Sequence, residues 1–295
     1  MVSEFELIKL FNNIGSKYNE QNGIVLSPGD DCAIIDLPLP IVTSIDASIC
    51  DVHFPNNASA KDIGYRAVAV ALSDIAAMGC QPRGFSISLS CLNQDISWYK
   101  DLADGFTNIA DEFQMSLIGG DVTKGPLNIN VVVYGTPYNS KFLRRNGAKK
   151  GDFICITKPV GRAKKGLEDF QNNKSESSFL EDYLRPKPQI ELGKKIVNYA
   201  SSCIDISDGL LSDLNHILVS SKVGAIILLD DIPITSDIDD INAGDDYDLC
   251  FTLPPQMMES KFYKIGEITE ELGIKFNSNK GYDASIKGFD HFKNE

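Results

Sequence analysis

The chain has 295 residues, 43% hydrophobic and 23% charged, which is enough for one large or two medium globular domains. Its formal net charge of −13 argues against broad binding to nucleic acid or to an anionic membrane, because both are themselves negatively charged. No apolar run approaches the roughly 20 residues of a membrane span, the first residues are acidic rather than signal-like, and the seven cysteines form no CxxC pair, so we expect a cytoplasmic protein with reduced thiols.

The first half of the chain is predicted to alternate helices with short strands. Gly79 is a plausible residue just beyond the end of a long helix, and Pro82 prevents the helix from continuing. Apolar and serine residues alternate from Gly84 to Cys91, which is typical of a strand with one buried face. The expected helices are 4–14, 59 or 60 to about 79, and 96–113, and the expected strands are 32–36, 41–45, 84–91, 115–118 and 128–134.

The second half repeats this alternation after a linker-like stretch at residues 137–140. We expect strands at 153–157, 225–229 and 249–253, and helices from about 161, from 189 to 200, and after Gly209. Strands alternating with helices and Gly-rich turns indicate an α/β or α+β fold in two halves. We place the domains at residues 1–137 and 138–295.

Short segments that combine Asp with Gly or Ser, called acidic knots below, are the most informative feature of the chain, and nearly every one lies beside an apolar run. Asp is common in turns, so any single knot is equally well explained by turn chemistry. Several carboxylates at the edge of a core repel one another and are costly to desolvate, and Mg²⁺ relieves both problems. The number of knots therefore favours a metal site. The six knots are Gly29-Asp30-Asp31, Ser44-Ile45-Asp46, Ser73-Asp74, Gly119-Gly120-Asp121, Asp205-Ile206-Ser207-Asp208-Gly209 and Gly244-Asp245-Asp246.

A basic segment from Lys141 to Lys165 contains nine cations and a single acid, Asp152. Such a run is usually a solvated surface, but Gly161 is expected to open a helix, and a helix N-terminus beside cations can bind an anion. The chain lacks the P-loop, dinucleotide-binding, protein-kinase and GxSxG patterns, and three scattered histidines give no persuasive hydrolase triad. Polyanion binding together with carboxylate-held Mg²⁺ would suit phosphoryl transfer.

Several long blocks, found from near the N-terminus to the C-terminal end, strongly resemble the thiamine-monophosphate kinase family, of the aminoimidazole-ribonucleotide synthetase and selenophosphate synthetase superfamily. The blocks are Gly29-Asp30-Asp31-Cys32-Ala33, His53-Phe54, residues 72–79, residues 119–127, residues 145–152, Arg185-Pro186-Lys187-Pro188, residues 204–210, Asp246-Tyr247-Asp248-Leu249 and Gly288-Phe289-Asp290-His291-Phe292.

The resemblance implies a kinase that transfers the γ-phosphoryl group of ATP to thiamine monophosphate, with several Mg²⁺ ions as cofactors. It also implies a two-domain subunit whose N-terminal domains pair through their sheets into a homodimer, with nucleotide bound between the domains. By position, the metal ligands are expected at Asp31, Ser44, Asp46, Asp74, Asp121, Asp205 and Asp208, the nucleotide contacts at Gly120, Asp121, Arg145 and Ser207, and the substrate contacts at His53, Asp245 and Phe289.

No general base is expected, because the acceptor is a phosphate monoester whose second pKa is about 6 and whose oxygen is already anionic near neutral pH. Three positions depart from the family pattern: Ile45 replaces Thr, Asp245 replaces Glu and Phe289 replaces Tyr. These changes bear on substrate affinity more than on reaction type. One rival hypothesis is a sister enzyme of the superfamily, but selenophosphate synthetase would be expected to carry a reactive cysteine ahead of the first acidic knot, and the first cysteine here is Cys32. The other rival is an inert nucleotide- or metal-binding protein, which would not need to retain this costly cluster of acids.

Overall fold

The computed structural model describes residues 4–27, 32–92, 95–282 and 284–285 and divides the chain into two units. Unit 1 comprises Met1–Ile75 and Cys80–Ser140, and unit 2 comprises Ala76–Gly79 and Lys141–Glu295. Helices and strands are mixed in both, in agreement with the expected fold class. In the described part of the chain, no helix has both the length and the hydropathy needed to cross a membrane.

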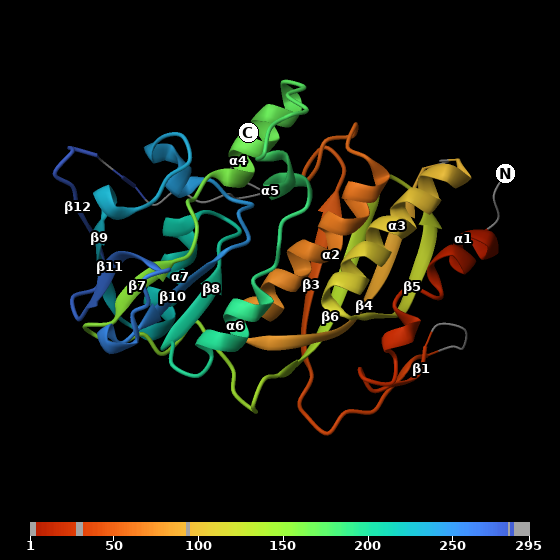
Figure 1. The fold of residues 1–295 in the computed structure, drawn as a ribbon, viewed down its shortest axis with the longest axis horizontal. Helices are drawn as coiled ribbons and strands as arrows, with labels where there is room; N and C mark the ends of the chain where they lie inside the picture. Colours follow the sequence, from red (N-terminus) through yellow and green to blue (C-terminus); the bar gives the residue numbers. More distant parts are fainter. Residues whose placement is uncertain (1–3, 28–31, 93–94, 283, 286–295) are drawn as a thin grey trace. The chain divides into compact units, whose positions relative to one another are not determined.

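Unit 1 is built on a four-stranded sheet in the order β3-β6-β4-β5 (Figure 1). Strand β6 pairs antiparallel with both β3 and β4, whereas β5 pairs parallel with β4. Strands β3 and β5 are therefore the two edges of the sheet. The elements of unit 1 are α1 (Glu4–Phe11), η1 (Ser16–Tyr18), β1 (Ile24–Leu26), β2 (Ile34–Ile35), β3 (Val42–Ile49), α2 (Ala60–Ala77), β4 (Cys80–Cys91), α3 (Ile96–Phe113), β5 (Ser116–Lys124) and β6 (Asn128–Pro137).

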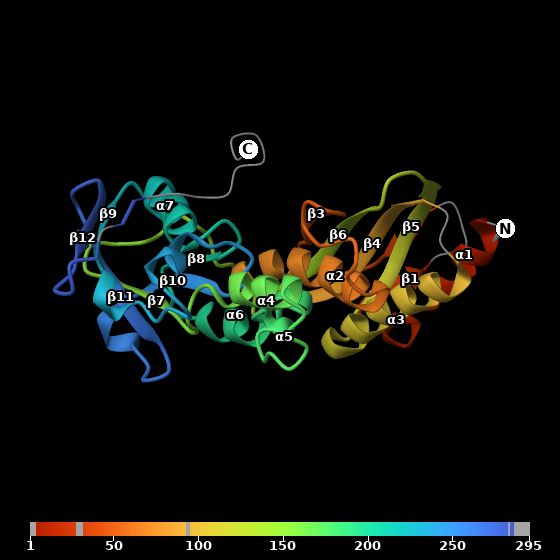
Figure 2. The ribbon, with the colours of Figure 1, turned by 90° about the horizontal axis from the view of Figure 1, so that it is seen from above.

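Helices α2 and α3 cover one face of this sheet (Figure 2). Asp95 caps α3 by accepting a hydrogen bond from the N–H group of Trp98 at 2.9 Å. The two helices approach closely at paired glycines: a Cβ at Gly64 would lie 2.5 Å from the backbone oxygen of Leu102, and one at Gly105 would lie 2.2 Å from that of Lys61. Only glycine allows this approach without displacing the backbone. The helices thereby bury the apolar residues of alternate strand positions.

Several expected strand boundaries in unit 1 are wrong. Strand β4 begins at Cys80 rather than at Gly84, because β6 is long enough to pair with it from Pro137. Strand β5 does not stop at Ile118 but continues through Gly119-Gly120-Asp121 to Lys124, because β4 offers a partner for each of these residues. Asp46 likewise lies inside β3 rather than at its end. The acidic knots at residues 44–46, 73–74 and 119–121 thus lie in strands and a helix, not in turns.

Unit 2 contains a six-stranded mixed sheet in the order β12-β9-β11-β7-β10-β8. Only the β12–β9 pair is parallel. The expected helix at 189–200 is shorter in the structure and ends at Ile196. The elements of unit 2 are β7 (Phe153–Ile156), α4 (Arg162–Gln171), α5 (Leu180–Leu184), α6 (Ile190–Ile196), β8 (Ser202–Asp205), α7 (Leu210–Ser221), β9 (Gly224–Leu228), η2 (Leu229–Asp231), η3 (Ile238–Asn242), β10 (Leu249–Leu253), η4 (Pro255–Met257), β11 (Tyr263–Thr269) and β12 (Gly273–Asn277).

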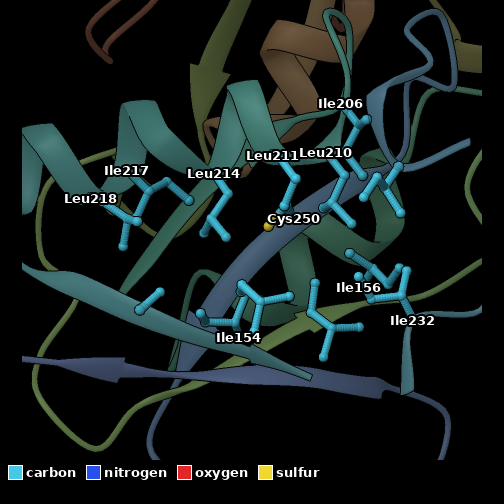
Figure 3. Close-up of a cluster of buried hydrophobic side chains, with 14 of the residues drawn as sticks. Ile154, Ile156, Ile206, Leu210, Leu211, Leu214, Ile217, Leu218, Ile232 and Cys250 are labelled. Carbon is cyan, nitrogen blue, oxygen red and sulfur yellow. The ribbon is translucent and has the colours of Figure 1, made fainter. Parts of the chain in front are cut away.

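Helix α7 forms the core of unit 2 with this sheet (Figure 3). Its apolar side chains repeat at helical spacing and point toward the strands, where they meet Ile154 and Ile156 of β7 and Cys250 of β10. These residues are at most 2% exposed, so the start of α7 is fixed by packing. The α7 side chains of this core are Leu210, Leu211, Leu214, Ile217 and Leu218.

Candidate functional site

Three of the expected metal ligands meet in unit 1, on β3 and α2. The side chains of Ser44 and Asp46 share a face of β3 because they are two residues apart, and it is the face that α2 covers. The Ser44 hydroxyl donates a hydrogen bond to Oδ2 of Asp74 on α2, at 2.5 Å. The structure therefore brings Ser44, Asp46 and Asp74 together.

The ionised form of the Asp46 carboxylate is disfavoured in this position. Burial, and to a lesser degree the neighbouring charge of Asp74, raise the pKa of Asp46 from 3.8 to about 6. Its buried Oδ2 has no hydrogen-bond partner among the described residues. An ionised, acceptor-only oxygen left in this state is costly, and a hard divalent cation is the ligand that would satisfy it. The residues of unit 1 thus fit a Mg²⁺ ion.

Gly120 and Asp121 lie on the opposite edge of the same sheet. The strand register places Asp46, Val131, Ile87 and Gly120 in one row across β3, β6, β4 and β5. Three strand spacings separate the ends of this row, or roughly 14 Å. Asp121 is exposed and pairs with Ser88, so its side chain points to the other face of the sheet from Asp46. Within one chain, the sheet does not bring Asp121 to Asp46.

In the described ranges, no group of three or more His, Cys, Asp or Glu residues is arranged to hold a metal ion. Ser44, Asp46 and Asp74 supply only two carboxylates, so a complete coordination shell needs further ligands. The expected ligand Asp31 and the expected substrate contact Phe289 lie outside the described residues.

His53 lies in the turn that follows β3, half buried. Its ring Nδ1 accepts a hydrogen bond from the backbone N–H group of Ile49 at 3.0 Å, and the backbone N–H group of His53 donates to the carbonyl oxygen of Ile49 at 2.8 Å. An Nδ1 that accepts this bond leaves the proton of the neutral ring on Nε2. His53 is therefore oriented by the backbone as a donor through Nε2.

In unit 2 the loop from Asp205 to Gly209 connects β8 to α7 and carries three expected site residues. Asp205, the last residue of β8, is buried, whereas Ser207 and Asp208 are half buried. The loop takes its shape from Asp213 on α7, whose Oδ2 accepts hydrogen bonds from the N–H groups of Ser207 and Asp208, both at 3.0 Å. Burial raises the pKa of Asp213 to about 7, and the charge of Asp208 adds to this while the N–H donors oppose it.

A second loop, residues 243–248, is joined to the first by backbone hydrogen bonds. Asp245 N–H donates to the Ser207 carbonyl at 2.9 Å, and Tyr247 N–H donates to the Ile206 carbonyl at 2.8 Å. A Cβ at Gly244 would lie 2.4 Å from the oxygen of Ser207, so the contact requires glycine. The structure thus places the expected substrate contact Asp245 directly beside the expected nucleotide contact Ser207.

The second loop has an unusual backbone. Asp245 has φ of 69° and Tyr247 has φ of 46°, both in the left-handed region that non-glycine residues seldom adopt. The hydroxyl of Tyr247 donates to Oδ1 of Asp245 at 3.0 Å. Strain of this kind persists where surrounding contacts impose it, and it is common at functional sites. Asp tolerates this conformation better than most residues, which suits the departure from the family's Glu at position 245.

The N-terminus of α4, a possible anion site in the sequence, is occupied by the protein's own carboxylate. Asp246 accepts hydrogen bonds from the N–H groups of Gly161 at 2.7 Å and Ala163 at 3.0 Å, while burial raises its pKa to about 6. Four cations of the basic segment are also paired within the protein. These pairs are Lys150 with Glu270, Arg162 with Asp182, Lys164 with Asp240, and Lys165 with Asp169.

Arg145 keeps an exposed side chain, and its backbone oxygen accepts a hydrogen bond from the Ser221 hydroxyl at 3.1 Å. The backbone oxygen of Arg144 is fixed in a similar way, by the N–H group of Cys203 at 2.9 Å. The side chains of both residues are exposed. Sequence reasoning selected Arg145 as a site residue but gave no role to Asp213 or Asp246, because their hydrogen bonds to backbone groups cannot be predicted from the sequence.

Several curated relatives of this chain carry the same family name. Residues 29–136 match the family model of the AIR synthase related protein, N-terminal domain. The thiamine-monophosphate kinase of Buchnera aphidicola (subspecies Schizaphis graminum) is 37% identical over 98% of this chain and 99% of its own length. The solved structure of the thiamine-monophosphate kinase from Stenotrophomonas maltophilia is 32% identical, with a TM-score of 0.84 over 91% of this chain and 95% of that one. A structure of AaThiL complexed with AMPPCP and TMP is 27% identical, with a TM-score of 0.80 over 98% and 97%.

Proposed function

Because this chain belongs to the thiamine-monophosphate kinase family, we propose that it transfers the γ-phosphoryl group of ATP to thiamine monophosphate, forming thiamine diphosphate and ADP. The observation that carries this proposal is the 32–37% identity to several kinases of that name over nearly the whole chain. The structure of AaThiL with an ATP analogue and TMP supports the pairing of these two ligands. The seven free cysteines suit a reducing, cytoplasmic location.

The reaction needs alignment and charge neutralisation more than proton transfer. Thiamine monophosphate presents an oxygen that is already anionic near neutral pH, so no side chain is required to deprotonate it. Bound Mg²⁺ would neutralise the phosphates and hold donor and acceptor in line. We assign Mg²⁺ ions to two sets of residues: Ser44, Asp46 and Asp74 with Asp31 and Asp121 in unit 1, and Asp205 and Asp208 in unit 2.

The remaining residues bind and orient the two substrates. Arg145, Gly120 and Ser207 are assigned to the nucleotide, Arg145 through a charge-assisted contact with phosphate. His53, Asp245 and Phe289 are assigned to thiamine monophosphate. The Nδ1 contact of His53 with Ile49 orients Nε2 as a hydrogen-bond donor, which suits a phosphate contact and not a base.

We further propose that the protein is a homodimer formed through the sheet of unit 1. Two features support this. The uncovered face of β3 exposes Ile45 by 66% and Ile49 by 37%. The two edge strands β3 and β5 carry Asp46 and Asp121, which lie too far apart in one sheet to share an ion. A second copy whose β5 edge meets the first copy's β3 edge would bring the two strands that carry these aspartates next to each other.

The catalytic proposal is tested by incubating the purified protein with ATP, Mg²⁺ and thiamine monophosphate and separating the products by chromatography. Equal amounts of thiamine diphosphate and ADP are expected, and neither should form when Mg²⁺ is chelated. ADP and inorganic phosphate without thiamine diphosphate would mean that the chain is only an ATPase.

The dimer is tested by mixing two inactive variants, Asp46→Asn and Asp121→Asn, under conditions that exchange subunits. If each site draws one aspartate from each copy, random pairing regenerates intact sites and restores about a quarter of wild-type activity. No recovery despite subunit exchange would place both residues in a site within one chain, and a monomer at assay concentration would refute the dimer itself.

A further inference from the structure

The buried carboxylate of Asp213 is not among the residues assigned to metal, nucleotide or substrate, yet it binds the backbone of two residues that are. Only 2% of Asp213 is exposed, so a direct contact with substrate is excluded in this conformation. A single atom, Oδ2, receives two consecutive backbone N–H groups, those of Ser207 and Asp208. These are the two residues of the β8–α7 loop assigned to nucleotide and metal.

The position of Asp213 is itself fixed by the core. It lies in the first turn of α7, and its N–H group donates to the Gly209 carbonyl at 3.0 Å. The flanking residues Leu211 and Leu214 are fully buried, so α7 cannot shift without opening the apolar cluster in Figure 3. Because α7 is held in place by the core, the hydrogen bonds of Asp213 also hold the preceding loop in place.

The opposite side of this loop is fixed by different bonds. The carbonyl groups of Ile206 and Ser207 accept the N–H groups of Tyr247 and Asp245. The loop thus has its N–H groups held by Asp213 and its carbonyl groups held by the 243–248 loop. With the backbone fixed on both sides, the half-buried side chains of Ser207 and Asp208 are the parts of the loop left to face a ligand.

We propose that Asp213 is a positioning residue that holds Ser207 and Asp208 in the arrangement that binds Mg²⁺-bound nucleotide. This inference rests on the proposed function. Losing the Asp213 acceptor would free the loop backbone while leaving the 243–248 loop in place, so nucleotide binding should weaken much more than binding of thiamine monophosphate. The effect would not resemble loss of a general base, because Asp213 touches no reacting atom.

A graded series of variants separates positioning from folding. Asp213→Asn keeps one oxygen that can accept both N–H groups, whereas Asp213→Ala leaves two buried donors without an acceptor. Loss of such an acceptor corresponds to a weakening on the order of tenfold to a hundredfold. We expect Asp213→Ala to raise the dissociation constant of Mg²⁺ with a non-hydrolysable ATP analogue by this factor, and Asp213→Asn to restore most of the affinity.

Asp169 provides a matched control. It is another buried carboxylate of unit 2, 3% exposed, but its partners are Lys165, Lys174 and Ser177, outside the two loops. Asp169→Ala should lower the melting temperature as Asp213→Ala does, yet leave the dissociation constant of the analogue unchanged. Calorimetric titration with the analogue and, separately, with thiamine monophosphate gives the binding constants without requiring turnover.

Three results would overturn the proposal. Equal weakening of both ligands by Asp213→Ala would indicate general destabilisation. An effect of Asp169→Ala on nucleotide binding as large as that of Asp213→Ala would indicate the same. Wild-type affinity in a folded Asp213→Ala protein would show that the loop needs no such support. If instead the wild-type protein bound the analogue but formed no thiamine diphosphate, the proposed function would fail while the positioning role of Asp213 stood.

Discussion

Asp46 offers a quantitative test of the metal site, because its carboxylate is costly in the absence of a cation. Burial and the charge of Asp74 give it a pKa of about 6, compared with 3.8 for an ordinary Asp. The folded protein therefore binds this proton more tightly than the unfolded chain does. It follows that the contribution of Asp46 to the free energy of unfolding is most favourable below about pH 4 and becomes unfavourable as the pH rises through about 6.

The size of this penalty follows from the two pKa values. Each pKa unit is worth about 1.4 kcal/mol, so the raised pKa of Asp46 lowers the free energy of unfolding of the metal-free protein, relative to its value at low pH, by roughly 3 kcal/mol at pH 8 and by about 1 kcal/mol at pH 4.5. Asp46→Asn removes the charge but leaves a buried amide that costs about 1 kcal/mol. The variant should therefore be about 2 kcal/mol more stable than wild type at pH 8 and nearly equal to it at pH 4.5.

The assay is urea unfolding in the presence of a chelator at both pH values. The matched control is Asp104→Asn on α3, which makes the same chemical change at an exposed position and should give no such pH dependence. Adding Mg²⁺ at pH 8 should stabilise wild type and not Asp46→Asn. A variant less stable than wild type at pH 8 without metal would refute the reasoning, since Asp46 would then be a structural hydrogen-bond acceptor.

The other predictions concern the residues assigned to the ligands. Asp121→Asn should abolish turnover but change the metal-free free energy of unfolding by less than about 0.5 kcal/mol, because Asp121 is exposed; a clear loss of stability in urea unfolding would make it a structural residue. Arg145→Ala should weaken ATP binding by roughly tenfold to a hundredfold and thiamine monophosphate binding much less, whereas Arg144→Ala should change neither; equal effects of the two variants in calorimetry would contradict the assignment. His53→Asn should raise the KM for thiamine monophosphate and leave the acidic limb of the pH–rate profile in place; loss of that limb with a fall in the chemical step of about 10²–10⁴-fold would reveal a general base. Tyr247→Phe removes the hydroxyl that orients Asp245 and should raise the KM for thiamine monophosphate several-fold, on the order of 1 kcal/mol, with the KM for ATP unchanged; a parallel rise in both constants would indicate general damage to the loop.

Local signals in the sequence predicted some elements well. The expected helix 96–113 has the same bounds in the structure because Asp95 caps its start and the chain turns left-handed at Gln114. The expected strand 249–253 is also confirmed, since an apolar run of this length is buried on both faces between β7 and β8. In both cases the information lies within a few residues of the element.

Long-range pairing could not be predicted in this way. The two glycines before Asp121 suggested the end of a strand, yet β4 pairs with β5 through them. The strand order β3-β6-β4-β5 is not sequential, so no local pattern shows that Asp46 and Asp121 lie on opposite edges. The resemblance to a family supplied the site residues, but it did not reveal that Asp213 and Asp246 hold backbone groups of the surrounding loops.

The central claim is that the acceptor is the phosphate of thiamine monophosphate, and a competition between two acceptors tests it most directly. The purified protein is given ATP labelled in the γ-phosphoryl group, Mg²⁺, and equal concentrations of thiamine and thiamine monophosphate, and the label is followed by chromatography. We predict that label enters thiamine diphosphate and that thiamine stays unphosphorylated, since its hydroxyl would need a general base and the proposed mechanism includes none. Label appearing in thiamine monophosphate, or only in inorganic phosphate, would contradict the account.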